Sequence, residues 1–313
     1  MKPEGLPVLP PSPDEAVTRA LFPGFTSETI ATSGATIRTL RGGNGPPLLL
    51  LHGHPQTHVC WHKIAPALAE HFTVVLTDLR GYGDSSFPES DATHAAYSKR
   101  AMAGDVAKVM TTLGFERFAV AGHDRGGRVG YRLALDAPER VSKLAVLDIV
   151  PTLDTYGPMT WRGSYRSYHW YFLVQPEPMP ETLIGANPDY YLDWTTRSWT
   201  ALDGTIEEAA MDEYRRWFRK PGAVHAACED YRAGYTRDME NDQRDRDAGK
   251  RIACPLLTLW GGGPTLQKPI SFLDVWKTWA DDVRGGPLEC GHFLPEELPK
   301  ETTAALLEFF TSV

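Results

Sequence analysis

Short apolar runs recur along the chain, and longer segments with apolar residues at helical spacing separate them. Short runs of this kind, bounded by turn residues, are typical of buried strands. Strands that alternate with helices predict an α/β fold, a mostly parallel sheet flanked by helices on both faces. The expected strands cover residues 47–51, 74–78, 118–122, 144–148 and 255–261, and the expected helices cover residues 64–70, 101–113, 128–136, 273–279 and 303–310.

This alternation breaks between residues 152 and 251, a stretch crowded with aromatic rings from Trp161 to Trp217. We interpret the stretch as a helical cap, inserted after the sixth strand and covering the carboxyl edge of the sheet, where ligands bind in such folds. The core of the α/β fold would then comprise residues 24–151 and 252–313. The proline-rich residues 1–23 are expected to form an N-terminal arm on the surface or against a neighbouring subunit.

Composition and charge argue against several classes of partner. The 313 residues carry a net charge of −8 and no block of lysine or arginine, which disfavours non-specific binding to nucleic acid. No apolar run approaches the roughly 20 residues that span a bilayer, and the chain starts without a signal-like apolar segment. The four cysteines are far apart and suit a reducing compartment. We expect a cytoplasmic protein without nucleic-acid or membrane partners.

A Gly-His-Asp-Arg-Gly turn, residues 122–126, follows an apolar strand and precedes a helix. This order matches the nucleophile elbow of α/β-hydrolases, a strained bend that raises one side chain above the sheet edge. Asp124 occupies the position where a serine is more usual. Because a carboxylate nucleophile forms an alkyl ester, Asp124 predicts displacement at a saturated carbon rather than acyl transfer.

An ester on Asp124 needs a base that activates water, and this fold carries its histidine on a late loop. His292 is the only histidine beyond position 225 and is the predicted base. Many hydrolases place the orienting acid soon after the strand that follows the cap, but residues 260–264 contain no acid. Asp148, at the end of an apolar run, is therefore the predicted orienting acid. The alternative is an ordinary aspartate in a turn.

The loop His52-Gly53-His54-Pro55 follows an apolar strand and matches the loop that donates one amide of an oxyanion hole. We expect the amides of His54 and Arg125 to form this hole. An alternative hypothesis is that His54, His58 and His62 bind a metal, because histidines spaced at i, i+4 and i+8 would lie on one face of a helix. Pro55 interrupts that spacing and no acid or cysteine pattern completes a site, so we expect no metal.

Two arginines, Arg125 and Arg128, flank the predicted nucleophile. Guanidinium groups suit bidentate binding of a carboxylate. The pair therefore predicts a small carboxylate substrate whose leaving group is on the adjacent carbon. The alternative is a pair of surface arginines that balance an acidic protein.

From about Phe22 to the C-terminus, the chain resembles the fluoroacetate (haloacetate) dehalogenases of the α/β-hydrolase superfamily. The resemblance implies that His169, Trp170 and Tyr231 surround the departing halide, each with an N–H or O–H donor, and that the protein is a homodimer. It is carried by residues 52–63, 78–86, 122–128, 144–152, 168–170, 228–234 and 290–297.

Together these features predict hydrolysis of fluoroacetate and related small 2-haloacids to 2-hydroxy acids and halide, without a metal or an organic cofactor. The main alternative is an epoxide hydrolase of the same fold, which also uses Asp and His with cap tyrosines. An epoxide has no carboxylate for Arg125 and Arg128 to bind. A ligand-binding protein on an inactive hydrolase scaffold is a further alternative.

Overall fold

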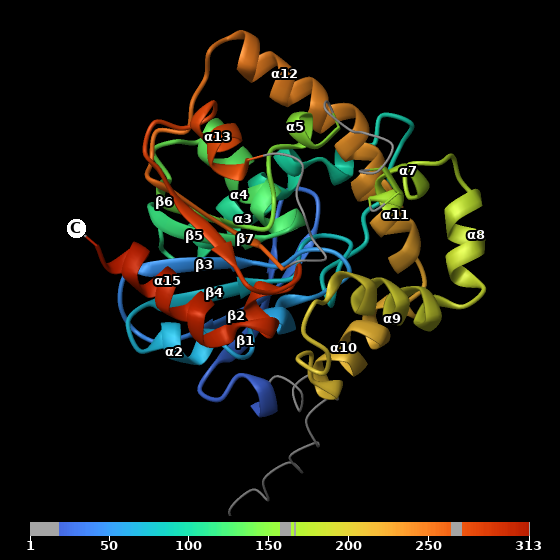
Figure 1. Ribbon diagram of the computed structural model, residues 1–313. Coiled ribbons are helices and arrows are strands. Elements are labelled where there is room, and N and C mark those ends of the chain that lie inside the picture. Colours follow the sequence, from blue (N-terminus) through green and yellow to red (C-terminus); the bar gives the residue numbers. More distant parts are fainter. Residues whose placement is uncertain (1–18, 157–163, 166, 264–270, 313) are drawn as a thin grey trace, which may run out of the picture.

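One sheet runs through the centre of the molecule (Figure 1). The computed structural model describes residues 19–156, 164–165, 167–263 and 271–312, and within them the sheet has eight strands in the order β1-β2-β4-β3-β5-β6-β7-β8. Strand β2 pairs antiparallel with β1 and β4, and the remaining neighbours are parallel. The strands are β1 (Thr26–Ala31), β2 (Thr36–Gly42), β3 (Pro47–Leu51), β4 (Thr73–Thr77), β5 (Phe118–His123), β6 (Val141–Leu147), β7 (Leu256–Gly261) and β8 (Val283–Leu288).

The five predicted strands correspond to β3, β4, β5, β6 and β7, which form the middle of this sheet. These strands are continuous apolar runs because both of their faces are buried. The prediction missed β1, β2 and β8. β1 and β8 lie at the edges and expose many of their residues, so their sequences contain no apolar run. The predicted α/β class is confirmed.

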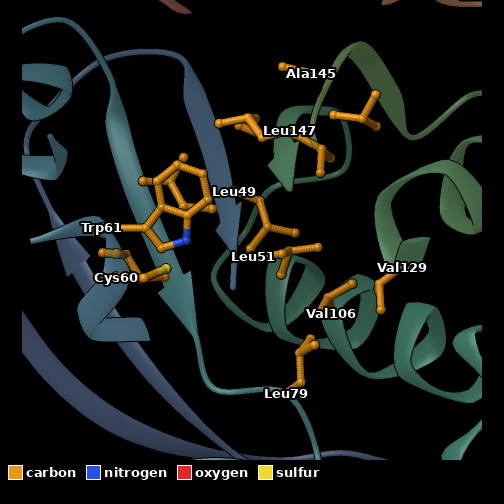
Figure 2. Packing of buried hydrophobic residues seen from close by; sticks show 14 of the residues in the cluster. Leu49, Leu51, Cys60, Trp61, Leu79, Val106, Val129, Ala145 and Leu147 are labelled. Carbon is orange, nitrogen blue, oxygen red and sulfur yellow. The ribbon is translucent and has the colours of Figure 1, made fainter. Parts of the chain in front are cut away.

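Helices cover both faces of the sheet. Figure 2 shows Leu49 and Leu51 of β3 pointing toward Val106 and Val129, which belong to two helices on one face. On the opposite face, Phe310 packs edge-on against Phe72. The helices and short helical turns of this core are η1 (His58–Trp61), α2 (Ala65–Ala69), η2 (Ala95–Tyr97), α3 (Lys99–Thr112), α4 (Arg125–Asp136), α13 (Phe272–Lys277), α14 (Leu294–Glu297) and α15 (Pro299–Thr311).

Four of the five predicted core helices, α3, α4, α13 and α15, begin one to four residues earlier than predicted, and for α3 and α4 the structure gives local reasons. Ser98 caps α3, since its side chain accepts a hydrogen bond from the backbone N–H of Ala101. Helix α4 starts at Arg125, directly after the turn, and its first bond runs from the N–H of Arg128 to the carbonyl of Asp124. The candidate nucleophile therefore lies at the N-terminus of a buried helix.

The predicted helical insertion follows β6, the sixth strand, and the chain returns to the sheet at β7. Figure 1 shows α7 to α11 grouped on one side of the molecule. The exact limits of the cap stay a prediction. Its helices are α5 (Thr152–Tyr156), α7 (Tyr168–Phe172), α8 (Met179–Gly185), α9 (Pro188–Trp199), α10 (Glu208–Phe218), α11 (Ala223–Ala233), the π-helical turn η3 (Gly234–Asp238) and α12 (Met239–Asp247).

The predicted arm is described only from residue 19 onward, because residues 1–18 lie outside the described residues. Phe22 is fully buried, with its ring 5.7 Å from that of Phe25 and 5.5 Å from that of His58. The end of the arm is therefore anchored in the core. In the described part of the chain, none of the helices is long and apolar enough to cross a bilayer.

Candidate active site

The turn between β5 and α4 has the geometry of a nucleophile elbow. Asp124 adopts φ 47° and ψ −117°, a strained conformation for a residue with a side chain. A Cβ atom on Gly122 would lie 2.5 Å from the carbonyl carbon of Gly126, and one on Gly126 would lie 2.4 Å from the carbonyl oxygen of Leu51. The two glycines are therefore required by close backbone packing on both sides of Asp124.

The carboxylate of Asp124 is buried and ionised. Burial would raise its pKa, but electrostatic interactions with nearby His292 and Arg125 outweigh burial and lower the pKa to about 2. Oδ1 accepts a hydrogen bond of 2.8 Å from the backbone N–H of His54. Oδ2 lies 3.8 Å from Nε2 of His292. One oxygen is thus held by the backbone and the other faces the candidate base.

His292 and Asp148 are brought together although 144 residues separate them. Nδ1 of His292 lies 2.6 Å from Oδ2 of Asp148, and Oδ1 of Asp148 accepts a hydrogen bond of 2.9 Å from the N–H of Gly261. Gly261, the last residue of β7, therefore supplies a backbone donor to Asp148 close to the position where many hydrolases have the acid. A Cβ on Gly261 would lie 2.0 Å from the carbonyl oxygen of Gly291, so only glycine fits.

The amide of His54 donates to Oδ1 of Asp124, and its role in an oxyanion hole stays a prediction. A Cβ on Gly53 would come within 2.4 Å of Asp124 Oδ1 and 2.8 Å of the Arg125 nitrogen, so both groups line the same narrow gap. The role of Arg125 as second donor stays a prediction.

Two histidines of the metal-binding alternative have other partners: Nδ1 of His58 lies 2.8 Å from Asp78, and Nδ1 of His62 lies 2.8 Å from the carbonyl of Val59. Both ring nitrogens of His54 have no hydrogen-bond partner among the described residues. Among the described residues, no group of three or more His, Cys, Asp or Glu side chains is placed to hold a metal ion.

Both arginines are buried, with 0% of Arg125 and 3% of Arg128 exposed, so the surface alternative is wrong. Asp230 binds Nε of Arg125 at 2.9 Å and Nη2 at 2.7 Å, which leaves Nη1. Arg128 donates from Nη1 to the carbonyl of Val150 and from Nη2 to Thr155, which leaves Nε. Within the described residues, Nη1 of Arg125 and Nε of Arg128 have no hydrogen-bond partner. Burying a charged donor without a hydrogen-bond partner costs free energy, and a bound anion would remove that cost by accepting a hydrogen bond.

The three residues of the predicted halide site lie close together. The ring of Tyr231 is 5.8 Å from that of His169 and 5.4 Å from that of Trp170. Burial, followed by the charge of Asp124, holds the pKa of Tyr231 well above its usual value, so its hydroxyl stays a donor. Burial, followed by nearby His54, holds the pKa of His169 well below its usual value, so its imidazole is neutral.

Two of these rings also pack on the arginines, which the sequence did not reveal. The guanidinium carbon of Arg125 lies 4.2 Å from the ring centre of Tyr231, and that of Arg128 lies 4.5 Å from the ring centre of Trp170. Stacking on an aromatic face stabilises a buried guanidinium group. Trp170 and Tyr231 therefore help to orient the arginines.

Residues 46–294 match the model of the family described as the α/β-hydrolase fold. The chain belongs to the α/β-hydrolase superfamily.

This hydrolase is 43% identical to a fluoroacetate dehalogenase from a Burkholderia species, over 93% of this chain and 95% of that protein. It is 34% identical to a soluble epoxide hydrolase from Corynebacterium sp. strain C12, over 91% of this chain and 97% of that protein. The crystal structure of a proposed α/β-hydrolase from Nostoc sp. PCC 7120 matches with a TM-score of 0.90 and 51% identity, covering 92% of this chain and 99% of that one. The predicted similarity to the dehalogenase family is confirmed.

Sequence reasoning missed two residues of this hydrolase site, Asp230 and Trp199. Asp230 lies next to Tyr231 in the family-like segment 228–234, and two buried arginines need a counter-charge, so that signal was available. The ring of Trp199 lies 4.5 Å from that of His169 and 5.3 Å from that of His292. No local pattern distinguishes Trp199 from the other tryptophans of the cap.

Proposed function

We propose that this hydrolase cleaves the carbon–halogen bond of fluoroacetate and related small 2-haloacids through an ester on Asp124. One observation carries the proposal: an ionised carboxylate at the elbow lies beside two buried guanidinium groups, each with one nitrogen that has no partner among the residues that the structure describes. A 2-haloacid matches both features, since it has a carboxylate for the arginines and a saturated carbon for Asp124. The 43% identity to a fluoroacetate dehalogenase supports the same reaction.

In the first step, Nη1 of Arg125 and Nε of Arg128 bind the substrate carboxylate and align the carbon–halogen bond with Asp124. Oδ1 stays on the amide of His54, so Oδ2 is the attacking atom. The Oδ2–carbon bond forms as the carbon–halogen bond breaks, and the bonding pair leaves with the halide. The donors of His169, Trp170 and Tyr231 receive the halide, and such preorganised donors lower the barrier most for fluoride, which hydrogen-bonds strongly.

In the second step, His292 removes a proton from a water molecule, which attacks the carboxyl carbon of the ester. Asp148 stabilises the resulting imidazolium. The negative charge on Oδ1 is held by the amides of His54 and Arg125 until the carbon–Oδ2 bond breaks and the 2-hydroxy acid leaves with a proton. A chiral substrate should react with inversion, because only the first step occurs at its stereocentre.

The test is halide release from fluoro-, chloro- and bromoacetate, together with the variant His292→Asn. We expect the wild type to release halide and the variant to accumulate a covalent adduct on Asp124, seen by intact-mass spectrometry. The adduct forms because removing the base blocks only ester hydrolysis. Full activity in Asp124→Ala, or no halide release above buffer, would show that the proposal is wrong.

An epoxide hydrolase is the second candidate, favoured by the 34% identical relative and by the buried, protonated hydroxyl of Tyr231. That hydroxyl and His169 could protonate an epoxide oxygen. A neutral epoxide would leave the free nitrogens of Arg125 and Arg128 without partners. Turnover of styrene oxide beside the haloacetates separates the two functions, since diol formation faster than halide release would favour the epoxide hydrolase.

A further inference from the structure

Glu297, the last residue of α14, accepts hydrogen bonds from the backbone of four residues. Its side chain is 4% exposed. Oε2 binds the N–H groups of Gly291 at 2.9 Å, Ala201 at 2.8 Å and Leu202 at 3.0 Å, and Oε1 binds that of Phe293 at 3.0 Å. Bonds from N–H to a carboxylate are charge-assisted and stronger than neutral ones. Glu297 therefore fixes main chain rather than side chains.

The four donors come from two different segments. Gly291 and Phe293 are the neighbours of His292, so Glu297 binds the backbone on both sides of the candidate base. Ala201 and Leu202 follow α9 in the cap. The N–H of His292 also donates to the carbonyl of Trp199 at 2.9 Å. A single carboxylate thus joins the loop of the base to the cap segment that carries Trp199.

The two segments are packed too closely for any side chain between them. A Cβ atom on Gly291 would lie 2.5 Å from the carbonyl oxygen of Trp199, 2.5 Å from the nitrogen of Ala201 and 2.6 Å from Oε1 of Glu297. The ring of Trp199 lies against those of both His292 and His169. A shift of the cap segment would therefore move the surroundings of the base.

We infer that Glu297 is a positioning residue that holds His292 in place for ester hydrolysis and makes this placement depend on the seated cap. The assignment to the hydrolysis step rests on the proposed function, whereas the link between the cap and the loop of the base does not. Glutamine at 297 would keep one acceptor oxygen and turn an NH2 group toward N–H donors. The loop would then lose part of its support.

Attack by Asp124 depends on other contacts, namely the amide of His54 and the two arginines. The bonds of Glu297 described above involve none of them. A base displaced by about 1 Å can slow its step by about 100-fold. We therefore expect Glu297→Gln to slow ester hydrolysis by about 10- to 100-fold and ester formation by less than about 3-fold. The fraction of enzyme in the ester form should rise.

The neighbouring Glu296 gives a matched control. Its side chain is 1% exposed and also belongs to α14, but it binds the side chains of Gln56 and Tyr214 instead of the loop of His292. Burial raises the pKa of Glu296 to about 8, so it is mostly protonated at neutral pH and glutamine resembles it closely. Glu296→Gln should leave both steps unchanged.

The experiment is rapid quenching of the full-length protein with chloroacetate at neutral pH, followed by intact-mass measurement of the ester. Ester accumulation in Glu297→Gln but not in Glu296→Gln supports the inference. Where the wild type releases chloride, equal slowing of both steps in Glu297→Gln, or no accumulation of the ester, overturns the inference. If Glu297→Gln does not fold, Glu297→Asp keeps the charge and shortens the reach by one methylene, and the same accumulation is expected.

A measurement without substrate separates this inference from the proposed function. The proton between Nδ1 of His292 and Asp148, across 2.6 Å, should give a downfield proton NMR signal that His292→Asn abolishes. We expect the signal to persist in Glu296→Gln and to shift or broaden in Glu297→Gln. An unchanged signal in Glu297→Gln overturns the inference, whereas failure of the wild type to release halide overturns only the proposed function.

Discussion

Asp124 is strained and buried, yet it is ionised. Its positive φ is imposed by the packing of Gly122 and Gly126 against neighbouring backbone, and its charge is maintained mainly by His292 and Arg125 against the cost of burial. Because its pKa is about 2, the nucleophile is ready across the whole neutral range. Changes at single positions around this carboxylate should therefore have large effects.

Gly53→Ala should disable the site. The added methyl group would lie 2.3 Å from Cβ of Asp124 and 2.8 Å from the nitrogen of Arg125, and neither atom can move without displacing the elbow. We expect turnover to fall by about 100-fold or more, as when an oxyanion donor is lost. Steady-state halide release measures this. Gly104→Ala in α3 is the control, because nothing lies within 4 Å of its Cβ position and activity should be kept.

Glu296 should make stability depend on pH. Burial raises its pKa from 4.5 to about 8, so the folded state binds the proton more tightly than the unfolded chain. The contribution of Glu296 to the free energy of unfolding is therefore fully present below about pH 4.5 and is lost as the pH rises through about 8. Urea unfolding between pH 5 and 9 should show a falling free energy of unfolding, and Glu296→Gln should flatten the fall. Equal slopes for the two proteins would contradict the assignment.

At the scale of elements, the site forms where helix α4 of the core meets helix α11 of the cap. Arg125 in the first turn of α4 binds Asp230 of α11 through Nε and Nη2. Asp230 also pairs with Lys99, at the start of α3, and accepts a hydrogen bond from Tyr82. Two cations therefore share one buried carboxylate, and the direction of Arg125 depends on a residue of the cap.

Asp230→Asn should weaken both stability and substrate binding. It would keep the shape of the side chain but leave Arg125 and Lys99 without their shared counter-charge, and breaking such buried pairs typically costs about 3–5 kcal/mol. Urea unfolding measures the loss, and KM for chloroacetate should rise because Arg125 is no longer oriented. Asp189→Asn removes a partner of Arg219 on the surface and is the control, with little expected change.

At the scale of the whole molecule, buried polar bonds join cap and core at several separate places. Tyr131 of α4 donates to Asp242 of α12 at 2.8 Å, and Arg132 binds the same carboxylate at 2.8 Å. The N–H of Lys99 donates to Asp238 at 2.9 Å. Opening of the cap alone would break these contacts together and expose or unpair buried charged groups, so its free-energy cost is high.

Cap and core should therefore unfold together. Differential scanning calorimetry is expected to show one transition, with a calorimetric enthalpy equal to the van't Hoff enthalpy. A separate transition of lower temperature, removed by deleting contacts of the cap, would contradict this expectation. Asp242→Asn should lower the single transition temperature without splitting it.

The amino-acid sequence alone predicted the middle of the sheet, the elbow with Asp124 and the candidates His292, Asp148, Arg125 and Arg128. The strands and the elbow are local features, because an apolar run predicts a buried strand and a glycine-bounded turn predicts a tight bend without reference to distant residues. The edge strands β1 and β8 were not predicted, because many of their residues are exposed and their sequences contain no apolar run.

Which charged and polar groups pair across the molecule became visible only in the folded chain. Asp230 lies 105 residues from Arg125, and Ala201 lies 96 residues from Glu297. Partners of this kind form because the cap folds back over the sheet edge and buries charges and amides that must then be paired. No local sequence pattern encodes which carboxylate reaches which donor, because that choice depends on packing between distant segments.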